Sequence, residues 1–233
     1  MATLYLVPNV LADGDWQNVL PAQVAPILTN TKYFIVENIR TARRFMKQVN
    51  REINIDACTF YEINKRTNAA DLPRFLKPIV DGHDVAVISE AGCPGVADPG
   101  ADVVKIAHQR GMKVVPIVGP SSILLALMAS GMNGQNFAFK GYLPVKPQER
   151  VKELQTLERR IRSSQQTQVF IETPYRNNQL VSDILKVCSP STLFCIAANI
   201  TGENEFIQTK SIQDWKKAGV PDLHKQPVIF LLG

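Results

Sequence analysis

The stretch "VISEAGCPGVADPGADVV", residues 87 to 104, passes from an apolar, strand-like segment through a turn into a helix-like segment. The turn contains two prolines and three glycines, more than a simple connection needs. Glycine permits unusual backbone conformations and lets a ligand approach the main chain, whereas proline restricts the loop before it folds. The stretch therefore predicts a preformed loop at the end of a strand.

Around this loop, apolar segments alternate with segments of helical spacing. Short runs rich in β-branched or aromatic residues predict buried strands at 3–7, 33–37, 57–61, 84–89 and 113–118. One intervening helix ends at Gly111, in the place of a C-cap. This alternation predicts an α/β fold with a mainly parallel sheet.

After residue 119 the strands become more closely spaced, which predicts a mixed sheet in a second α/β domain. "SSILLALMAS" predicts a helix with two serines suited to N-capping. Further helices are expected at 147–163, 176–187 and 211–217, and strands at "TQVFIE", "TLFCIAA", "EFIQT" and "PVIFLLG". We expect domains over residues 1–117 and 121–233, with "VGPSS" as the linker.

Composition narrows the class of protein. The chain of 233 residues shows neither a charged-then-apolar leader nor an apolar run of about 18 residues, so we expect a cytoplasmic protein without a membrane partner. Four cysteines without a CxxC pair and only three histidines argue against a metal site or a disulfide framework. The net charge of +5 favours an anionic partner such as nucleic acid, but also fits many ordinary enzymes.

The loops after the strands are the expected ligand site, because open parallel sheets bind ligands beyond the carboxyl ends of their strands. Neither G-x-G-x-x-G nor G-x-x-x-x-G-K-[ST] is present, which argues against dehydrogenases and P-loop NTPases. The end of the opening loop also fits an ordinary helix start, with Asp98 as N-cap and Pro99 at the first helical position.

Five motifs carry a family resemblance: "TLYLVP", "EAGCPGVADPG", "GMKVVPIVGPSSILLALMASGM", "FKGYLPVK" and "FIETPYR". In this order and spacing the chain resembles the tetrapyrrole methylase superfamily, the class III S-adenosylmethionine-dependent methyltransferases. It looks most like the branch that methylates a cytidine ribose in small-subunit ribosomal RNA. The resemblance covers essentially the whole chain. It implies two α/β domains with S-adenosyl-L-methionine in the cleft between them, and a homodimer.

The resemblance also implies site residues. The positions matching the cofactor site are Pro8, Gly92, Cys93, Val96, Ser122, Ile123, Thr173 and Ala198. Glu172 and Asp98 are candidate general bases, although Glu172 could instead orient Arg176 and Asp98 could only cap a helix. Arg40 and Arg176 are the expected substrate-binding residues.

The chain departs from this branch mainly where substrate is expected. The loop after the first strand reads "NVLADGDWQN" instead of an Ile-Gly-Asn-Leu type, and Glu-Asp-Thr-Arg becomes "ENIR" at 37–40. Arg-Glu-Leu-Thr-Lys becomes "ANITG" at 198–202, which removes two cations and a carboxylate. The branch usually carries a small extra C-terminal domain, and this chain ends at Gly233.

Three functions therefore stay open: a methyltransferase acting on RNA, one acting on a small molecule such as a tetrapyrrole, and a cofactor-binding or regulatory module. Arg40, Arg43, Arg44 and Lys47 have the i, i+3, i+4, i+7 spacing of one helix face. Such a face can track RNA phosphates, and the same spacing fits a solvated face.

Overall fold

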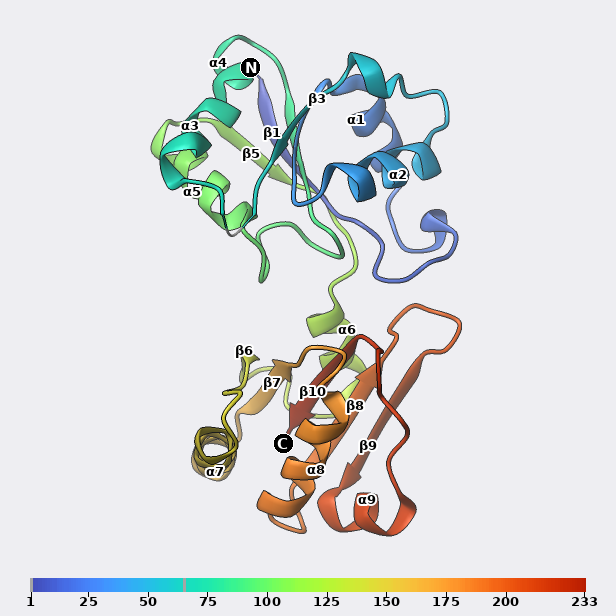
Figure 1. The fold of residues 1–233 in the computed structure, drawn as a ribbon, viewed down its shortest axis with the longest axis vertical. Helices are drawn as coiled ribbons and strands as arrows, with labels where there is room; N and C mark the ends of the chain where they lie inside the picture. The colour runs from blue at the N-terminus through green and yellow to red at the C-terminus, as the bar shows by residue number, and fades with distance from the viewer. Residues whose placement is uncertain (1, 65) are drawn as a thin grey trace. The chain divides into compact units, whose positions relative to one another are not determined.

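The computed structural model describes residues 2–64 and 66–233. The chain divides into two compact units, unit 1 over Met1–Ser121 and unit 2 over Ser122–Gly233. Each unit is built around its own five-stranded sheet with helices on both faces (Figure 1). None of the helices in the described part of the chain combines the length and apolar character needed to cross a membrane.

The sheet of unit 1 is parallel throughout, which confirms the predicted fold class. Its strands are β1 (Thr3–Val7), β2 (Tyr33–Val36), β3 (Thr59–Glu62), β4 (Val85–Ile88) and β5 (Lys113–Pro116), in the order β3-β2-β4-β1-β5. β3 begins two residues later than predicted. The Asn54 side chain accepts a hydrogen bond from the Asp56 amide and starts a 3-10 turn, η2 (Ile55–Ala57), before the strand.

Helices cover both faces of this sheet. The helical elements are η1 (Trp16–Asn18), α1 (Val24–Asn30), α2 (Ile39–Val49), η3 (Ala69–Asp71), α3 (Leu72–Phe75), α4 (Lys77–Val80) and α5 (Gly100–Gln109). Apolar residues of α1 and α2 pack on one face, and those of α3, α4 and α5 on the other (Figure 1). α5 ends as predicted, with Gly111 at φ +65° and its amide donating to the His108 carbonyl at 3.0 Å.

This arrangement creates a switch point between two neighbouring strands. β1 and β4 lie side by side, but β1 continues into α1 on one face and β4 into α5 on the other. The connections therefore diverge at the carboxyl ends of β1 and β4. In open α/β sheets, such divergence opens a crevice in which ligands bind.

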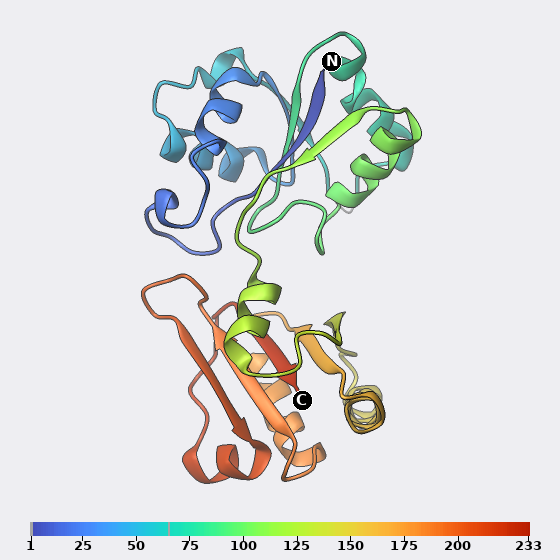
Figure 2. The same cartoon turned by 180° about the vertical axis from the view of Figure 1, so that it is seen from behind.

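Unit 2 has a mixed sheet, as predicted. Its strands are β6 (Phe137–Tyr142), β7 (Thr167–Ile171), β8 (Leu193–Ala198), β9 (Phe206–Ser211) and β10 (Val228–Leu232), in the order β6-β7-β10-β8-β9. β6 is parallel to β7, and the other pairs are antiparallel. α7 (Pro147–Ser164), α8 (Asn177–Val187) and α9 (Ile212–Ala218) pack on one face, and Figure 2 shows α6 (Ser122–Ser130) on the other.

A buried ion pair joins two helices of unit 2. The Arg150 side chain on α7 is 5% exposed and donates to Asp183 Oδ2 on α8 through Nε at 2.8 Å and Nη2 at 2.5 Å. Its Nη1 donates to the carbonyls of Pro144 and Val145 at 3.2 and 2.8 Å. Because the guanidinium is almost fully paired, it fixes the start of α7 against α8.

Replacing Arg150 with Ala is expected to lower the free energy of unfolding by about 3–5 kcal/mol, because Asp183 is left buried without its cation. Urea unfolding measures the change. Arg159→Ala, an exposed arginine on the same helix, should cost no more than about 0.5 kcal/mol. Equal losses in the two variants would show that the ion pair does not hold the helices together.

Candidate functional site

Two loops at the carboxyl edge of unit 1 are joined by backbone hydrogen bonds. The Asn9 amide donates to the Gly92 carbonyl at 2.9 Å, and the Gly92 amide donates back at 3.1 Å. Gly92 has φ +69°, and a Cβ there would lie 3.1 Å from Leu11 Cδ2 and 3.2 Å from the Pro120 carbonyl oxygen. The backbone conformation therefore favours glycine, and a side chain here would also be crowded by Leu11 and Pro120.

The loop after β5 joins the same cluster. A Cβ on Gly119 would lie 2.2 Å from Pro8 Cβ, so only glycine lets the main chain pack this closely against the Pro8 ring. The Cys93 thiol contacts the Pro120 carbonyl at 3.3 Å, and burial raises the pKa of this thiol. The structure thus brings together Pro8, Gly92 and Cys93. Val96 is linked to Cys93 by a backbone bond of 3.3 Å and is 52% exposed.

Asp98 closes the opening loop onto the helix that follows. Its Oδ1 accepts hydrogen bonds from the amides of Gly95 at 2.8 Å and Gly100 at 2.7 Å. α5 begins at Gly100 with Pro99 as its N-cap, so the prediction of Asp98 as N-cap and Pro99 as first helical residue is wrong by one position. Oδ2 is buried and has no hydrogen-bond partner among the described residues. Asp98 therefore organises the loop, and its role as a base stays a prediction.

In unit 2, the predicted residues lie at one edge of the sheet. β7 and β8 both run antiparallel to β10, so their carboxyl ends meet at the same edge. Glu172 and Thr173 follow β7, and Ala198 ends β8. The Asn199 amide donates to the Pro227 carbonyl at 3.0 Å, which ties the loop after β8 to the segment before β10.

Glu172 is a buried carboxylate at this edge, with 1% of its side chain exposed. Its Oε1 accepts hydrogen bonds from the Thr173 amide at 2.6 Å and from Arg176 Nε and Nη2 at 3.0 and 2.6 Å. Its Oε2 has no partner among the residues described. Glu172 therefore holds Arg176 in place, while proton transfer by Glu172 stays a prediction.

The remaining predicted residues lie at the starts of helices. Ser122 and Ile123 are the first two residues of α6, and both are half-buried. Arg40 lies in the first turn of α2 and is exposed. Within the described ranges its side chain has no hydrogen-bond or ion-pair partner, so its guanidinium is available to a ligand.

Sequence reasoning missed two polar residues of unit 1. Asn9 is 6% exposed and donates through Nδ2 to the carbonyls of Ser89 and Glu90, both at 3.1 Å. Glu37 Oε1 accepts from the Glu90 amide at 3.0 Å; burial raises the pKa of Glu37, and the charges of Asp98 and Glu90 add to the rise. Both residues closely follow an apolar strand, and that position was the available signal.

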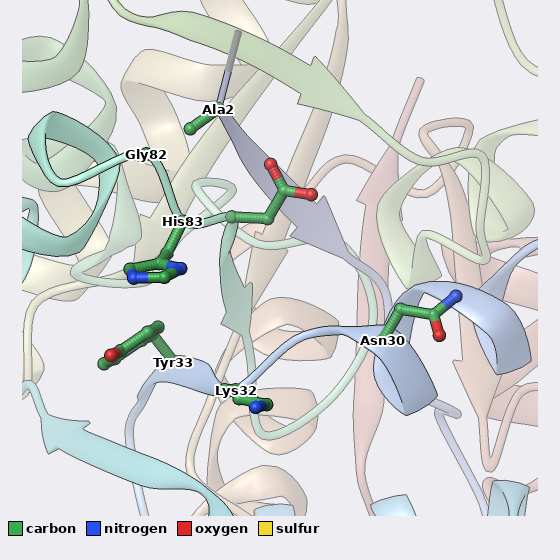
Figure 3. A pocket seen from close by; sticks show the side chains of 7 residues that line it. Ala2, Asn30, Lys32, Tyr33, Gly82 and His83 are labelled. Carbon is green, nitrogen blue, oxygen red and sulfur yellow. The ribbon is translucent and has the colours of Figure 1, made fainter.

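A different pocket of about 430 Å³ lies at the amino ends of β1, β2 and β4 (Figure 3). The Tyr33 and His83 rings lie near one another there, with centroids 5.4 Å apart, and Asn30, Lys32 and Asp84 also line the pocket. This edge is opposite to the one where parallel sheets bind cofactors. The size of this pocket therefore does not make it the candidate cofactor site. No group of His, Cys, Asp or Glu in the described residues is arranged to hold a metal ion.

Comparison with known proteins places this geometry in context. The chain is 30% identical over 206 residues to "Ribosomal RNA small subunit methyltransferase I" of Vibrio cholerae, covering 88% of this chain and 67% of that protein. The proteins of the same name from Pseudomonas aeruginosa and Bacillus subtilis are 27% and 31% identical. These matches cover 99% and 80% of this chain, and 79% and 60% of the relatives.

Solved structures show the same fold. The methyltransferase CobJ superposes with a TM-score of 0.63 at 19% identity, covering 100% of this chain and 92% of that one. A uroporphyrin-III-C-methyltransferase from Thermus thermophilus gives a TM-score of 0.57 at 16% identity, covering 100% and 94%. The family pattern described as Tetrapyrrole (Corrin/Porphyrin) Methylases matches residues 27–215. The chain therefore belongs to the Tetrapyrrole (Corrin/Porphyrin) Methylases.

Proposed function

We propose that the protein is an S-adenosylmethionine-dependent methyltransferase that acts on a ribose hydroxyl of ribosomal RNA. The observation that carries this proposal is the similarity, over 80 to 99% of the chain, to three bacterial proteins named for methylation of small-subunit ribosomal RNA. The proposal includes a homodimer and a location in the cytoplasm, where ribosomal RNA is found. Both the homodimer and the cytoplasmic location are proposed on the resemblance to this family.

We infer that the cofactor contacts the loops after β1, β4 and β5 of unit 1. For Ser122, Ile123, Thr173 and Ala198 of unit 2, the proposal of cofactor contact is supported by the family resemblance alone. The loop after β4 is rich in glycine and proline, and a Cβ at Gly92 or Gly119 would crowd the Pro120 carbonyl or the Pro8 ring. Such surfaces suit a ligand recognised mainly by shape and by hydrogen bonds to the main chain. This fits S-adenosylmethionine better than a polyphosphate ligand.

Bound S-adenosylmethionine supplies an electrophilic methyl group on a sulfonium. The protein's task is then to hold the attacking ribose oxygen in line and to exclude water. Glu172 and Asp98 are our candidates for accepting the hydroxyl proton. Each has one oxygen bound by backbone amides, which fixes the carboxylate, and a second oxygen without a partner among the described residues.

The exposed cations of α2 are the surface that we propose for RNA phosphates. Arg43 lies over the Phe60 ring at 5.0 Å, and Lys47 Nζ donates to the Arg51 carbonyl at 2.8 Å. Arg40 and Arg44 have no such partners among the described residues, so the phosphate-binding role falls mainly on these two. Unit 2 adds a general attraction for a polyanion, because it contains 13 lysines and arginines against nine aspartates and glutamates.

The cofactor site is tested by replacing Gly92 with Val. The side chain would meet Leu11 and the Pro120 carbonyl, and we expect binding of S-adenosylmethionine to weaken by at least about tenfold in calorimetry. Gly111→Val is the matched control, because Gly111 has a similar φ of +65° but no atom within 4 Å of the point that a Cβ would occupy. Unchanged binding by a folded Gly92→Val protein would show that the site lies elsewhere.

The substrate class is tested by transfer of labelled methyl groups to extracts of cells lacking this protein. We expect label in ribosomal RNA, at a ribose 2′ oxygen, and none in the small-molecule fraction. Label confined to small molecules would favour a tetrapyrrole-like substrate. Label in neither fraction, with cofactor still bound, would indicate a binding module, consistent with the altered "ANITG" segment at 198–202.

Salt dependence tests the cations of α2. Each phosphate contact contributes about 0.7 to 0.9 to the slope of log affinity against log salt, so Arg40→Ala should reduce that slope by about one unit. Lys105→Ala removes an exposed cation from α5, on the opposite face of the sheet, and should leave the slope unchanged. Filter-binding titrations at several salt concentrations measure both slopes. Equal slopes for the two variants would exclude Arg40 from phosphate contact.

A further inference from the structure

A pocket of about 290 Å³ lies within unit 1 at the switch point between β1 and β4. Three separate segments line it: residues 9–13 after β1, Glu90 and Ala91 after β4, and the exposed side of α2. The lining does not include the proposed cofactor residues Pro8, Gly92, Cys93 and Val96. It does include Asn9, which follows Pro8 in the chain, and Ala91, which precedes Gly92. The pocket is therefore next to the proposed cofactor residues and distinct from them.

The pocket is held open by hydrogen bonds between its walls. Gln48 Nε2 on α2 donates to the Gly14 carbonyl at 2.8 Å, which fixes the loop after β1 against the helix. The Thr41 hydroxyl donates to Glu90 Oε1, which fixes the loop after β4 against the same helix. A ligand entering this pocket would consequently meet preformed walls.

Three charged side chains line this small space: the cation Arg44 and the carboxylates Glu90 and Asp13, of which Asp13 is exposed in the loop after β1. Arg44 lines it and has no hydrogen-bond or ion-pair partner among the described residues. Glu90 Oε2 likewise has no partner there, while the buried Phe45 provides an apolar wall. A ligand that fits carries an anionic group for Arg44, a hydrogen-bond donor for Glu90 and a flat apolar surface for Phe45.

One wall of the pocket is formed by a segment in which the chain departs from the ribosomal branch. The loop "NVLADGDWQN" supplies residues 9–13, and Thr41 and Arg44 follow the "ENIR" segment at 37–40. Residues 37–40 themselves do not line the pocket. The divergent loop after β1 therefore changes one wall of the pocket, where it would alter the recognition of a bound group.

We propose that this pocket binds one nucleotide of the RNA substrate, with a phosphate on Arg44 and a hydroxyl or amino group of the same nucleotide donating to Glu90. The proposal rests on the proposed RNA methyltransferase function. A volume just below the roughly 300–1,000 Å³ of pockets for drug-sized ligands admits a single nucleotide rather than a helix. Such recognition of one unstacked nucleotide is common in RNA binding.

The direct test is titration of the full chain with adenosine, cytidine, guanosine and uridine 5′-monophosphates, followed by NMR. At least one of the four nucleotides should bind the wild-type protein saturably, and Arg44→Ala should weaken the affinity for that nucleotide by about tenfold or more. Arg74→Ala is the matched control, because Arg74 is an exposed arginine of the same unit that lies over Phe75 on the other face of the sheet. It should bind like wild type.

Methyl transfer gives the second readout. Arg44→Ala should lower kcat/KM on ribosomal RNA by about tenfold or more while binding S-adenosylmethionine like the wild-type protein. Loss of cofactor binding in Arg44→Ala would assign the pocket to the cofactor and overturn the proposal. The proposal would also be overturned if none of the four nucleotides bound saturably, or if inorganic phosphate bound as tightly as the nucleotides. If wild-type protein methylates no RNA, the proposed function fails, and the nucleotide titration still decides the pocket.

Discussion

The paired backbone hydrogen bonds between Asn9 and Gly92 are the constraint on which the candidate site depends. β1 and β4 are neighbours in the sheet, but their chains leave toward opposite faces. Without a connection beyond the strands, the two loops would be free to separate. The reciprocal bonds at 2.9 and 3.1 Å keep them together, and the left-handed conformation of Gly92 is what allows its amide and carbonyl to point at Asn9.

Local patterns predicted the elements of both units well, because buried strands and capped helices leave short-range signals. Gly111 marked the end of α5 and "PVIFLLG" marked β10. The order of the strands in each sheet could not be predicted from the sequence. β4 lies between β1 and β2 because of packing over long separations, and no local pattern encodes such neighbours. The late start of β3 also escaped prediction, since the Asn54 turn competes locally with the strand.

For the site, the resemblance located the loops, and the structure supplied the contacts within them. The sequence left open whether Glu172 orients Arg176 or acts as a base, and the structure shows the contact between the two residues. The close approach of Gly119 to Pro8 could not be predicted from the sequence, because the two residues lie more than 100 positions apart in the chain. Ala97, at φ +63°, gave no signal either, since alanine rarely adopts this conformation and only the surrounding loop imposes it.

The position of β1 in the sheet also determines how long this strand waits for its partners during synthesis. Among the described strands, β1 pairs with β4 and β5, and these strands follow about 80 and 110 residues later in the chain. Ribosomes add about 5 to 20 residues per second, so this apolar strand is synthesised several seconds before either of its partners. During that interval it is an unpaired strand in the nascent chain, exposed to other chains and to chaperones. The completed sheet removes this vulnerability by placing β1 between two neighbours.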